Sequence, residues 1–183
     1  AGVSRIILVV GYKQHIIRAF IASEFPGRKD IIFVENPLWK KTNVLGSLYR
    51  AKSYLTRETV ILHGDTLYPP QLMRELLEKP ETDARLVVQR KKVGDEEMKY
   101  VTDGNGSILV LSKLIEHRRA EGEFMGISYI SKRFALRLRA VLERESFQEF
   151  RYQYYEWGLM LVHLVYRMHL HTHDASTHPM IEI

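Results

Sequence analysis

Three apolar segments alternate with helix-like segments in the first 65 residues, and this order limits the chain to a few folds. The segments IILVV at 6–10, IIFVE at 31–35 and TVILHGD at 59–65 are dominated by branched apolar residues. Such runs are typical of parallel strands that are buried on both faces. Apolar residues recur at helical spacing over 16–21, and a second helix is expected over 44–55. The resulting strand–helix–strand–helix–strand order favours right-handed crossovers and a parallel sheet.

The second half of the chain is more mixed. A helix at 71–78 and a strand at 84–90 precede the sequence DGNGS at 103–107, which predicts a hairpin turn. Further strands are expected at 123–131, 168–173 and 179–183, with helices at 132–144 and 154–166. We see no internal repeat and no linker. The sequence therefore predicts one domain over residues 1–183, an α/β fold with a Rossmann-like, mixed but mostly parallel sheet and helices on both faces.

Composition excludes several classes of protein. The chain contains no cysteine, which rules out disulfide scaffolds, thiol chemistry and cysteine-ligated zinc. Its 45% hydrophobic and 27% charged residues argue against disorder. The longest apolar runs, such as 158–162, are too short to cross a bilayer, and no segment resembles a signal peptide. We therefore expect no membrane partner and a cytoplasmic location.

The net charge of +5 and the pI near 9.4 make an anionic partner plausible, for example a nucleotide or a phosphorylated metabolite. The basic residues are scattered, however, and the densest cluster, at 90–92, is followed by three acids at 95–97. No stripe of basic and aromatic residues indicates a nucleic-acid groove. A nucleic-acid partner is therefore not expected, although a surface that binds polyanions stays an alternative.

The sequence His63-Gly64-Asp65 ends the third apolar segment. Ligands of open α/β sheets bind beyond the carboxyl ends of strands, where Gly64 would allow close approach of a bound group. Asp65 is a hard oxygen ligand suited to Mg²⁺ and a catalytic candidate. Glu182, near the end of the last expected strand, is the second candidate metal ligand if the two strands are neighbours. An ordinary strand-to-turn Gly-Asp is the alternative.

Residues 35–52 contain an Asn-Pro turn and then Thr42-Asn43 at an expected helix start. A helix start offers N–H groups and polar side chains to a nucleotide. Asn43, Ser47 and Gly64 are therefore the expected nucleotide-binding residues. The alternative is that Thr42 or Asn43 serves only as a helix N-cap.

Two further segments suggest substrate contacts. In YQYYEW at 152–157, the rings of Tyr154 and Tyr155 beside Glu156 could hold a quaternary ammonium by cation–π attraction. The alternative is that these aromatic residues begin a buried helix. Lys99 is a catalytic candidate because it could pair with a phosphate, but an exposed lysine needs no function.

Three histidines alternate near the C-terminal end, at His169, His171 and His173. Residues two apart share one face of a strand, so a transition-metal site is conceivable, and a solvated face is the alternative. No serine lies in a G-x-S-x-G sequence, so a nucleophilic triad has no support.

Taken in order, these segments resemble the sugar-phosphate and alcohol-phosphate nucleotidyltransferase superfamily, and most closely its CTP:phosphocholine cytidylyltransferase-like proteins. The resemblance spans essentially the whole chain. It rests on GVSRIILVVGYKQHIIRAF at 2–20, the NP…TN…SL pattern over 36–48, HGDTLY at 63–68, DEEMKY at 95–100, GEFMGISYIS at 122–131, YYE at 154–156 and the terminal IEI.

The resemblance implies an enzyme that transfers a nucleotidyl group, with Mg²⁺, from a nucleoside triphosphate to a phosphorylated small alcohol such as phosphocholine. CTP is the expected donor and pyrophosphate the leaving group. It implies a metal-binding role for Asp65 and Glu182, and a nucleotide-side role for Asn43 and Ser47. Tyr154, Tyr155 and Glu156 fall on the acceptor side. A sugar- or inositol-1-phosphate acceptor is the alternative within the superfamily.

The chain also departs from the superfamily pattern. Its members open with a strand, a glycine-rich loop and a helix that grip the triphosphate, and they end with an aspartate after the terminal E-I; neither is present here. Val44 stands where a second Asn is usual, and Trp157 where an Asp is expected. We therefore expect a domain that is incomplete at both ends. A non-catalytic nucleotide-binding or regulatory domain is a third reading, and a homodimer is left open.

Overall fold

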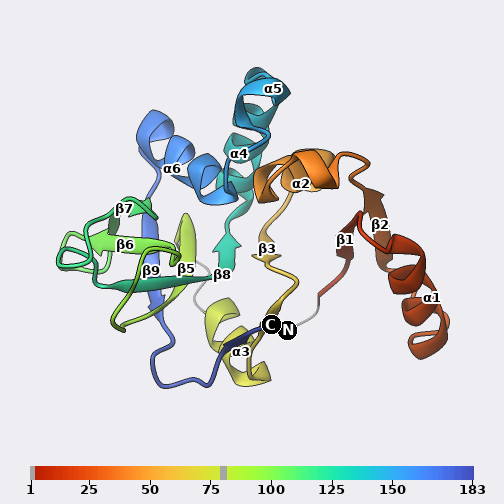
Figure 1. Cartoon of the computed structure of the whole chain (residues 1–183), viewed down its shortest axis with the longest axis horizontal. Coiled ribbons are helices and arrows are strands. Elements are labelled where there is room, and N and C mark those ends of the chain that lie inside the picture. Colours follow the sequence, from red (N-terminus) through yellow and green to blue (C-terminus); the bar gives the residue numbers. More distant parts are fainter. Residues whose placement is uncertain (1–2, 79–81) are drawn as a thin grey trace.

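The computed structural model describes residues 3–78 and 82–183. Figure 1 shows a central sheet with α2, α4, α5 and α6 on one face and α3 on the other, so the predicted covering of both faces is confirmed. The helices are α1 (Gln14–Glu24), α2 (Val44–Arg50), α3 (Pro70–Leu77), α4 (Lys132–Arg144), α5 (Phe147–Phe150) and α6 (Tyr155–Tyr166). The strands are β1 (Ile6–Val10), β2 (Ile31–Glu35), β3 (Thr59–Leu62), β4 (Thr66–Leu67), β5 (Ala84–Gln89), β6 (Lys99–Thr102), β7 (Ile108–Ser112), β8 (Gly122–Ile130), β9 (Leu170–Asp174) and β10 (Ile181–Glu182).

The first strand–helix–strand unit is the parallel pair that the apolar segments predict. β1 and β2 run parallel from Ile6↔Ile31 to Val10↔Glu35. α1 connects them, and the Arg18 guanidinium lies 4.5 Å from the centroid of the Phe33 ring on β2. α1 contains no fully buried residue, and Phe20 is 57% exposed.

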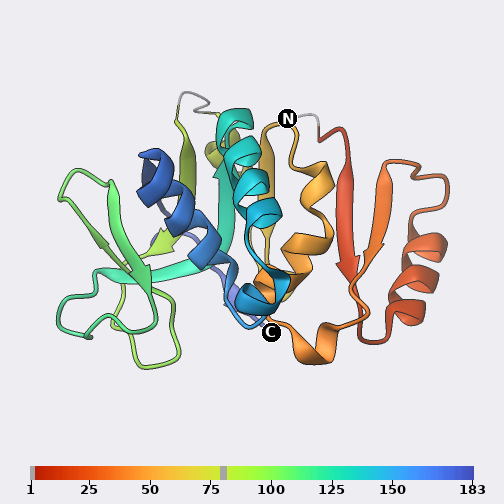
Figure 2. The ribbon, with the colours of Figure 1, turned by 90° about the horizontal axis from the view of Figure 1, so that it is seen from above.

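Six of the other strands form a mixed sheet in the order β7-β6-β8-β5-β9, with β3 also paired to β8, whereas β4 and β10 form a separate two-stranded sheet. β5 and β9 are parallel, whereas β8 is antiparallel to β3, β5 and β6. The third apolar segment therefore pairs with β8 and does not continue the β1–β2 ladder. Within the described ranges, β1 and β3 have one ladder partner each, and Figure 2 shows an interval between them.

Several boundaries differ from the sequence expectation. The strands expected at 168–173 and 179–183 are Leu170–Asp174 and Ile181–Glu182. The helix expected over 44–55 ends at Arg50 and is followed by a separate 3-10 turn, Lys52–Tyr54. The strand expected over 59–65 ends at Leu62, where its ladder with β8 reaches Ile127. The chain then turns at 64–65 and enters a short strand, β4. Gly64 and Asp65 are exposed in this turn, whereas His63 is partly buried.

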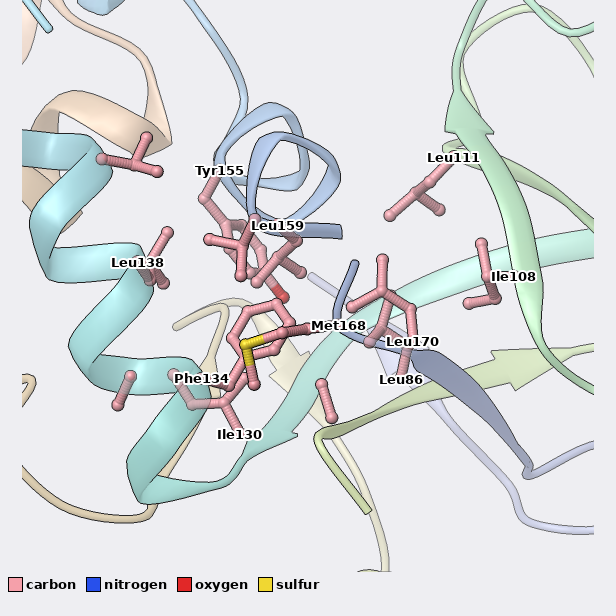
Figure 3. Packing of buried hydrophobic residues seen from close by; sticks show 14 of the residues in the cluster. Leu86, Ile108, Leu111, Ile130, Phe134, Leu138, Tyr155, Leu159, Met168 and Leu170 are labelled. Atoms are coloured by element: carbon pink, nitrogen blue, oxygen red, sulfur yellow. The ribbon is translucent and has the colours of Figure 1, made fainter. Parts of the chain in front are cut away.

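The main core lies between the mixed sheet and the helices α2, α4 and α6. Figure 3 shows side chains from α4, α6, β5 and β9 meeting there, among them Phe134, Leu159, Leu86 and Leu170. A second cluster packs α3 through Leu72 and Leu76 against the other face. The predicted helices at 132–144 and 154–166 are confirmed as α4 and α6, and their apolar faces build this core. Of the helices described, none is both long and apolar enough to span a membrane.

Candidate functional site

The two predicted metal ligands lie near one short strand pair, Glu182 on β10 and Asp65 in the turn directly before β4. β4 pairs antiparallel with β10, with Glu182 opposite Thr66. The backbone N–H of Ile183 donates to the carbonyl oxygen of Asp65 at 2.8 Å. The last strand therefore lies beside the segment that follows Asp65, and not beside the strand that precedes it, and both carboxylates are exposed. A shared metal-binding role of the two acids stays a prediction.

His63, which precedes Gly64 and Asp65 in the chain, is partly buried. It was not among the residues predicted for the site. Burial lowers the pKa of its imidazole, while the charges of Asp65 and Glu182 act in the opposite direction. Its Nε2 is buried and has no hydrogen-bond partner among the described residues. The negative charges of both acids thus act on the pKa of His63. Its place directly before Gly64-Asp65 was the only available sequence signal.

Gly126 on β8 makes room for the His63 ring. Gly126 has φ of +70°, and a Cβ at this position would lie 2.5 Å from Nδ1 of His63. The Gly126 carbonyl also accepts the His63 backbone N–H at 3.0 Å. By contrast, a Cβ built on Gly64 meets nothing within 4 Å. Open space at Gly64 agrees with its predicted role of letting a ligand approach, which stays a prediction.

The carboxylate pair fits the donor set that Mg²⁺ uses in proteins. Mg²⁺ is usually held by one or two carboxylates together with substrate phosphates and water, because it gives up its waters reluctantly. Asp65, in the turn before β4, and Glu182, on β10, would supply two such oxygen donors. A larger cluster of metal-ligating side chains does not occur within 3–78 and 82–183. The rings of His169 and His171 are 6.0 Å apart, without a third metal-ligating residue grouped with them in those ranges.

The start of α2 is already occupied by hydrogen bonds within the protein. Asn43 is the N-cap, and its Oδ1 accepts the backbone N–H of Val44 at 2.8 Å. The N–H groups of Asn43 and Leu45 donate to the carbonyl oxygens of Arg151 and Gln153, and Gly46 N–H donates to the Asn43 carbonyl. The expectation of free N–H groups at this helix start is therefore wrong. The N-cap alternative accounts for Asn43.

These bonds tie the segment predicted for the nucleotide to the segment that leads into α6. Asn43 Nδ2 also donates to the Tyr152 carbonyl at 3.4 Å. Ser47 Oγ accepts from Nδ2 of the buried Asn36 at 3.2 Å. Asn43 is thus bonded to the segment that precedes the acceptor-side residues, whereas Ser47 is bonded to Asn36. Contact of either residue with a nucleotide stays a prediction.

The three acceptor-side candidates occupy different environments. Tyr155 is completely buried, and its hydroxyl lies 3.3 Å from Ser128 Oγ. Its ring packs edge-on against the His63 ring, with centroids 5.3 Å apart. The expectation that the Tyr155 ring holds a ligand ammonium is therefore wrong, because the ring is enclosed in the core; the alternative of an aromatic residue that begins a buried helix accounts for it. Tyr154, in contrast, is 38% exposed and can meet a ligand directly.

Glu156 is a buried carboxylic acid at the first turn of α6. It is 2% exposed, and Oε2 has no hydrogen-bond partner among the described residues. Burial raises the pKa of Glu156 to about 7, although its own backbone N–H and the nearby Lys113 favour the charged form. A buried carboxylate without a direct partner is costly unless a cation approaches it. Glu156 therefore holds its proton more readily than an exposed glutamate does.

Lys99 is buried, not exposed, so the alternative of an ordinary surface lysine is wrong. It is 1% exposed, and its Nζ donates to the backbone carbonyls of Lys113 at 2.6 Å and Asp95 at 3.4 Å. The ammonium group therefore fixes two loop segments next to the acceptor side. A direct catalytic contact of Lys99 stays a prediction.

The arrangement defines a fold shared with the sugar-phosphate and alcohol-phosphate nucleotidyltransferases, and the resemblance predicted from the sequence is confirmed. The chain superimposes over its full length on 71% of the inositol-1-phosphate CTP transferase from T. maritima, with a TM-score of 0.78 and 18% identity. It likewise covers 74% of the CTP:phosphocholine cytidylyltransferase from Streptococcus pneumoniae, with a TM-score of 0.75 and 16% identity.

Two curated proteins are similar in sequence. The chain is 28% identical over 147 residues, 80% of its length, to the CMP-5'-(3-aminopropyl)phosphonate synthase of Streptomyces rubellomurinus, and it spans only 22% of that protein. It is 23% identical over 155 residues, 85% of its length, to the D-glycero-alpha-D-manno-heptose 1-phosphate guanylyltransferase of Campylobacter jejuni, covering 67% of it. No protein-family model matches the chain.

Proposed function

We propose that this protein transfers a cytidylyl group from CTP to a phosphorylated small amino alcohol such as phosphocholine. A phosphate oxygen of the acceptor would form a bond to the α-phosphorus while the bond to pyrophosphate breaks. One observation carries the proposal. The exposed carboxylates Asp65 and Glu182 and the buried Glu156 are linked through the contact between His63 and Tyr155.

Asp65 and Glu182 are the residues that would hold Mg²⁺. When bound, the ion would supply charge neutralisation and orientation for the phosphate groups. The chain itself contributes the two exposed carboxylates and the open space beside Gly64. Asn43 and Ser47 would contact the nucleotide through their side chains, since the N–H groups at the start of α2 are already used. A cytoplasmic location is part of this proposal.

The acceptor class follows from Tyr154 and Glu156. An aromatic ring face next to a carboxylate favours an ammonium over a neutral hydroxyl group. The similarity to a protein named for CMP-5'-(3-aminopropyl)phosphonate supports an acceptor that carries both an amine and a phosphorus oxyanion. Tyr154 would cover the ammonium, and Glu156 would compensate its charge.

A sugar- or inositol-1-phosphate acceptor is the second candidate. It is favoured by the similarity to the T. maritima inositol-1-phosphate CTP transferase, which has the highest TM-score quoted above. Such an acceptor would use Glu156 to accept hydroxyl hydrogen bonds and would gain little from the Tyr154 ring. A domain that binds nucleotide without catalysis would share the same fold.

Equilibrium binding of CDP-choline, CDP-inositol and UDP-glucose separates these candidates. We expect CDP-choline to bind about tenfold more tightly, in line with one partly desolvated cation–π contact. A preference for either of the other two nucleotides contradicts the amino-alcohol acceptor. Release of pyrophosphate from CTP and phosphocholine then tests catalysis, because a purely binding domain would release none.

A further inference from the structure

β2 leaves one of its two backbone edges unpaired. Within the described ranges it has a ladder partner only on the β1 side, and Figure 2 shows it as the outermost strand at this end of the molecule. The hydrogen bonds between β1 and the β2 segment extend from the Asp30 carbonyl, at 2.9 Å, to the Asn36 N–H, at 2.8 Å. Because the backbone groups of successive strand residues point to opposite sides, Ile31, Phe33 and Glu35 direct theirs outward.

Helix α1 does not close this edge. A hollow of about 390 Å³ lies between its C-terminal half and β2, and its lining includes Ile21, Phe25, Ile31 and Phe33. Phe25 is 45% exposed, and α1 contains no fully buried residue. The Arg18 guanidinium over the Phe33 ring places the side chains of the outward-facing residues on the α1 side of the strand. A strand added beside β2 therefore meets free backbone groups and an apolar hollow next to them.

The two ends of this edge carry opposite charges. Lys29, in the turn before β2, and Glu35, the last residue of β2, are both exposed. Neither forms an ion pair with another described residue. Asp30, in contrast, is already paired with Arg28 through two bonds of 2.7 Å. The edge is thus apolar in the middle, positive at its start and negative at its end, so it is complementary to an antiparallel copy of itself.

We propose that a second copy of this chain pairs with β2 edge to edge and antiparallel, with the two-fold axis at Ile32. In this register Ile31 lies opposite the partner's Phe33, and Lys29 lies opposite the partner's Glu35, each contact occurring twice by symmetry. An axis at Phe33 would instead put Glu35 opposite the partner's Ile31 and leave both charges unpaired. The two β1–β2 ladders become one four-stranded sheet, which is more stable than an isolated pair of strands.

Sedimentation velocity of the whole chain over a concentration series measures the Kd of this dimer. Glu35→Lys turns both ion pairs into repulsions with Lys29, so we expect a Kd about ten- to thirtyfold higher. Lys29→Glu should act in the same way. The double swap Lys29→Glu/Glu35→Lys should restore the wild-type Kd, because it exchanges the charges of both partners. Glu145→Lys is the matched control, since Glu145 is exposed at the end of α4, and it should leave the Kd unchanged.

Cross-linking tests the register, and the absence of cysteine from the chain makes the test specific. The two copies of residue 32 form a non-hydrogen-bonded pair with Cα atoms about 4.5 Å apart, within the span of a disulfide. Ile32→Cys should therefore give a disulfide-linked dimer under mild oxidation. Val34→Cys is the control, because the two copies of residue 34 are offset by four positions, about 13 Å, which is beyond the reach of a disulfide.

Three outcomes overturn the inference. The first is a wild-type chain that stays monomeric at hundreds of micromolar. The second is a dimer whose Kd is unchanged in Glu35→Lys or is not restored by the double swap, since its interface would then lie elsewhere. The third is equal cross-linking of the two cysteine variants, which contradicts the register. The inference does not rest on the proposed function, because these measurements contain no nucleotide, acceptor or metal.

Discussion

At the scale of single residues, Gly126 and His63 depend on each other. The left-handed φ of +70° at Gly126 costs an ordinary residue roughly 1–2 kcal/mol, and a Cβ there would also collide with the His63 ring. The imidazole in turn lies close enough to Asp65 and Glu182 to feel both charges. Gly126 on β8 thereby allows the His63 ring to take its position next to the turn that carries Asp65.

Gly126→Ala should lower the free energy of unfolding by about 2–4 kcal/mol, the sum of backbone strain and overpacking. Gly64→Ala is the control, because a Cβ there meets nothing within 4 Å and φ is not positive. Urea unfolding of the two variants measures the difference. Equal stability of both variants would show that the His63 ring does not require a glycine.

At the scale of elements, α6 carries a buried acid at the end where a helix best tolerates one. The positive end of the helix dipole and the Glu156 backbone N–H favour the carboxylate, but burial outweighs them and raises its pKa to about 7. In the unfolded chain the same group titrates near its ordinary value. Between these two values the folded state binds the proton more tightly than the unfolded state does.

Stability should therefore fall as pH rises from about 4.5 to about 7 and then level off, with a loss on the order of 2 kcal/mol from this group. Glu156→Gln keeps the shape of the side chain without its charge. We expect the variant to match the wild type near pH 4.5 and to exceed it above pH 7, in urea unfolding at each pH. An identical pH slope for both proteins would contradict the assignment.

The elements also show how far sequence reasoning reaches. Apolar runs and helical spacing predicted α4, α6 and the β1–β2 pair because each is a local pattern. The same patterns do not indicate which strands pair with each other, so the antiparallel pairing of β3 with β8 could not be predicted. Asp65 and Glu182 were candidate metal ligands because each lies near the end of an expected strand, on the condition that the two strands are neighbours, and the family resemblance implies the same pair. Their adjacency is decided by the β4–β10 ladder.

Lys99 and Lys113 illustrate the same limit. A lysine in a sequence reads as a surface residue, and burial of Lys99 depends on two backbone carbonyls brought close by folding. The approach of Lys113 to Tyr154 joins residues that lie 41 positions apart in the chain. Such contacts have no periodic signature, and only the packed structure reveals them.

At the scale of the whole molecule, the described residues form three separate sheets, which are β1–β2, β4–β10 and the mixed sheet around β8. β1–β2 and the mixed sheet around β8 are separate, and Figure 2 shows α2 beside the interval between β1 and β3. The carboxylate edge is built by the β3–β4 turn and β10, whereas the acceptor side is built by α6 and the segment after β7. The proposed function requires that Asp65 and Glu182 act together at that edge on a nucleotide.

Calorimetric titration of CTP, with and without Mg²⁺, tests this claim most directly in the wild type, Asp65→Asn and Glu182→Gln. We expect Mg²⁺ to lower the Kd of CTP in the wild type. In each variant the Kd of CTP with Mg²⁺ should be about tenfold higher than in the wild type, roughly the effect of losing one charged contact. Both side chains are exposed, so the substitutions should leave the fold intact. CTP affinity that is equally tight in all three proteins, or that does not respond to Mg²⁺ in the wild type, would contradict the account.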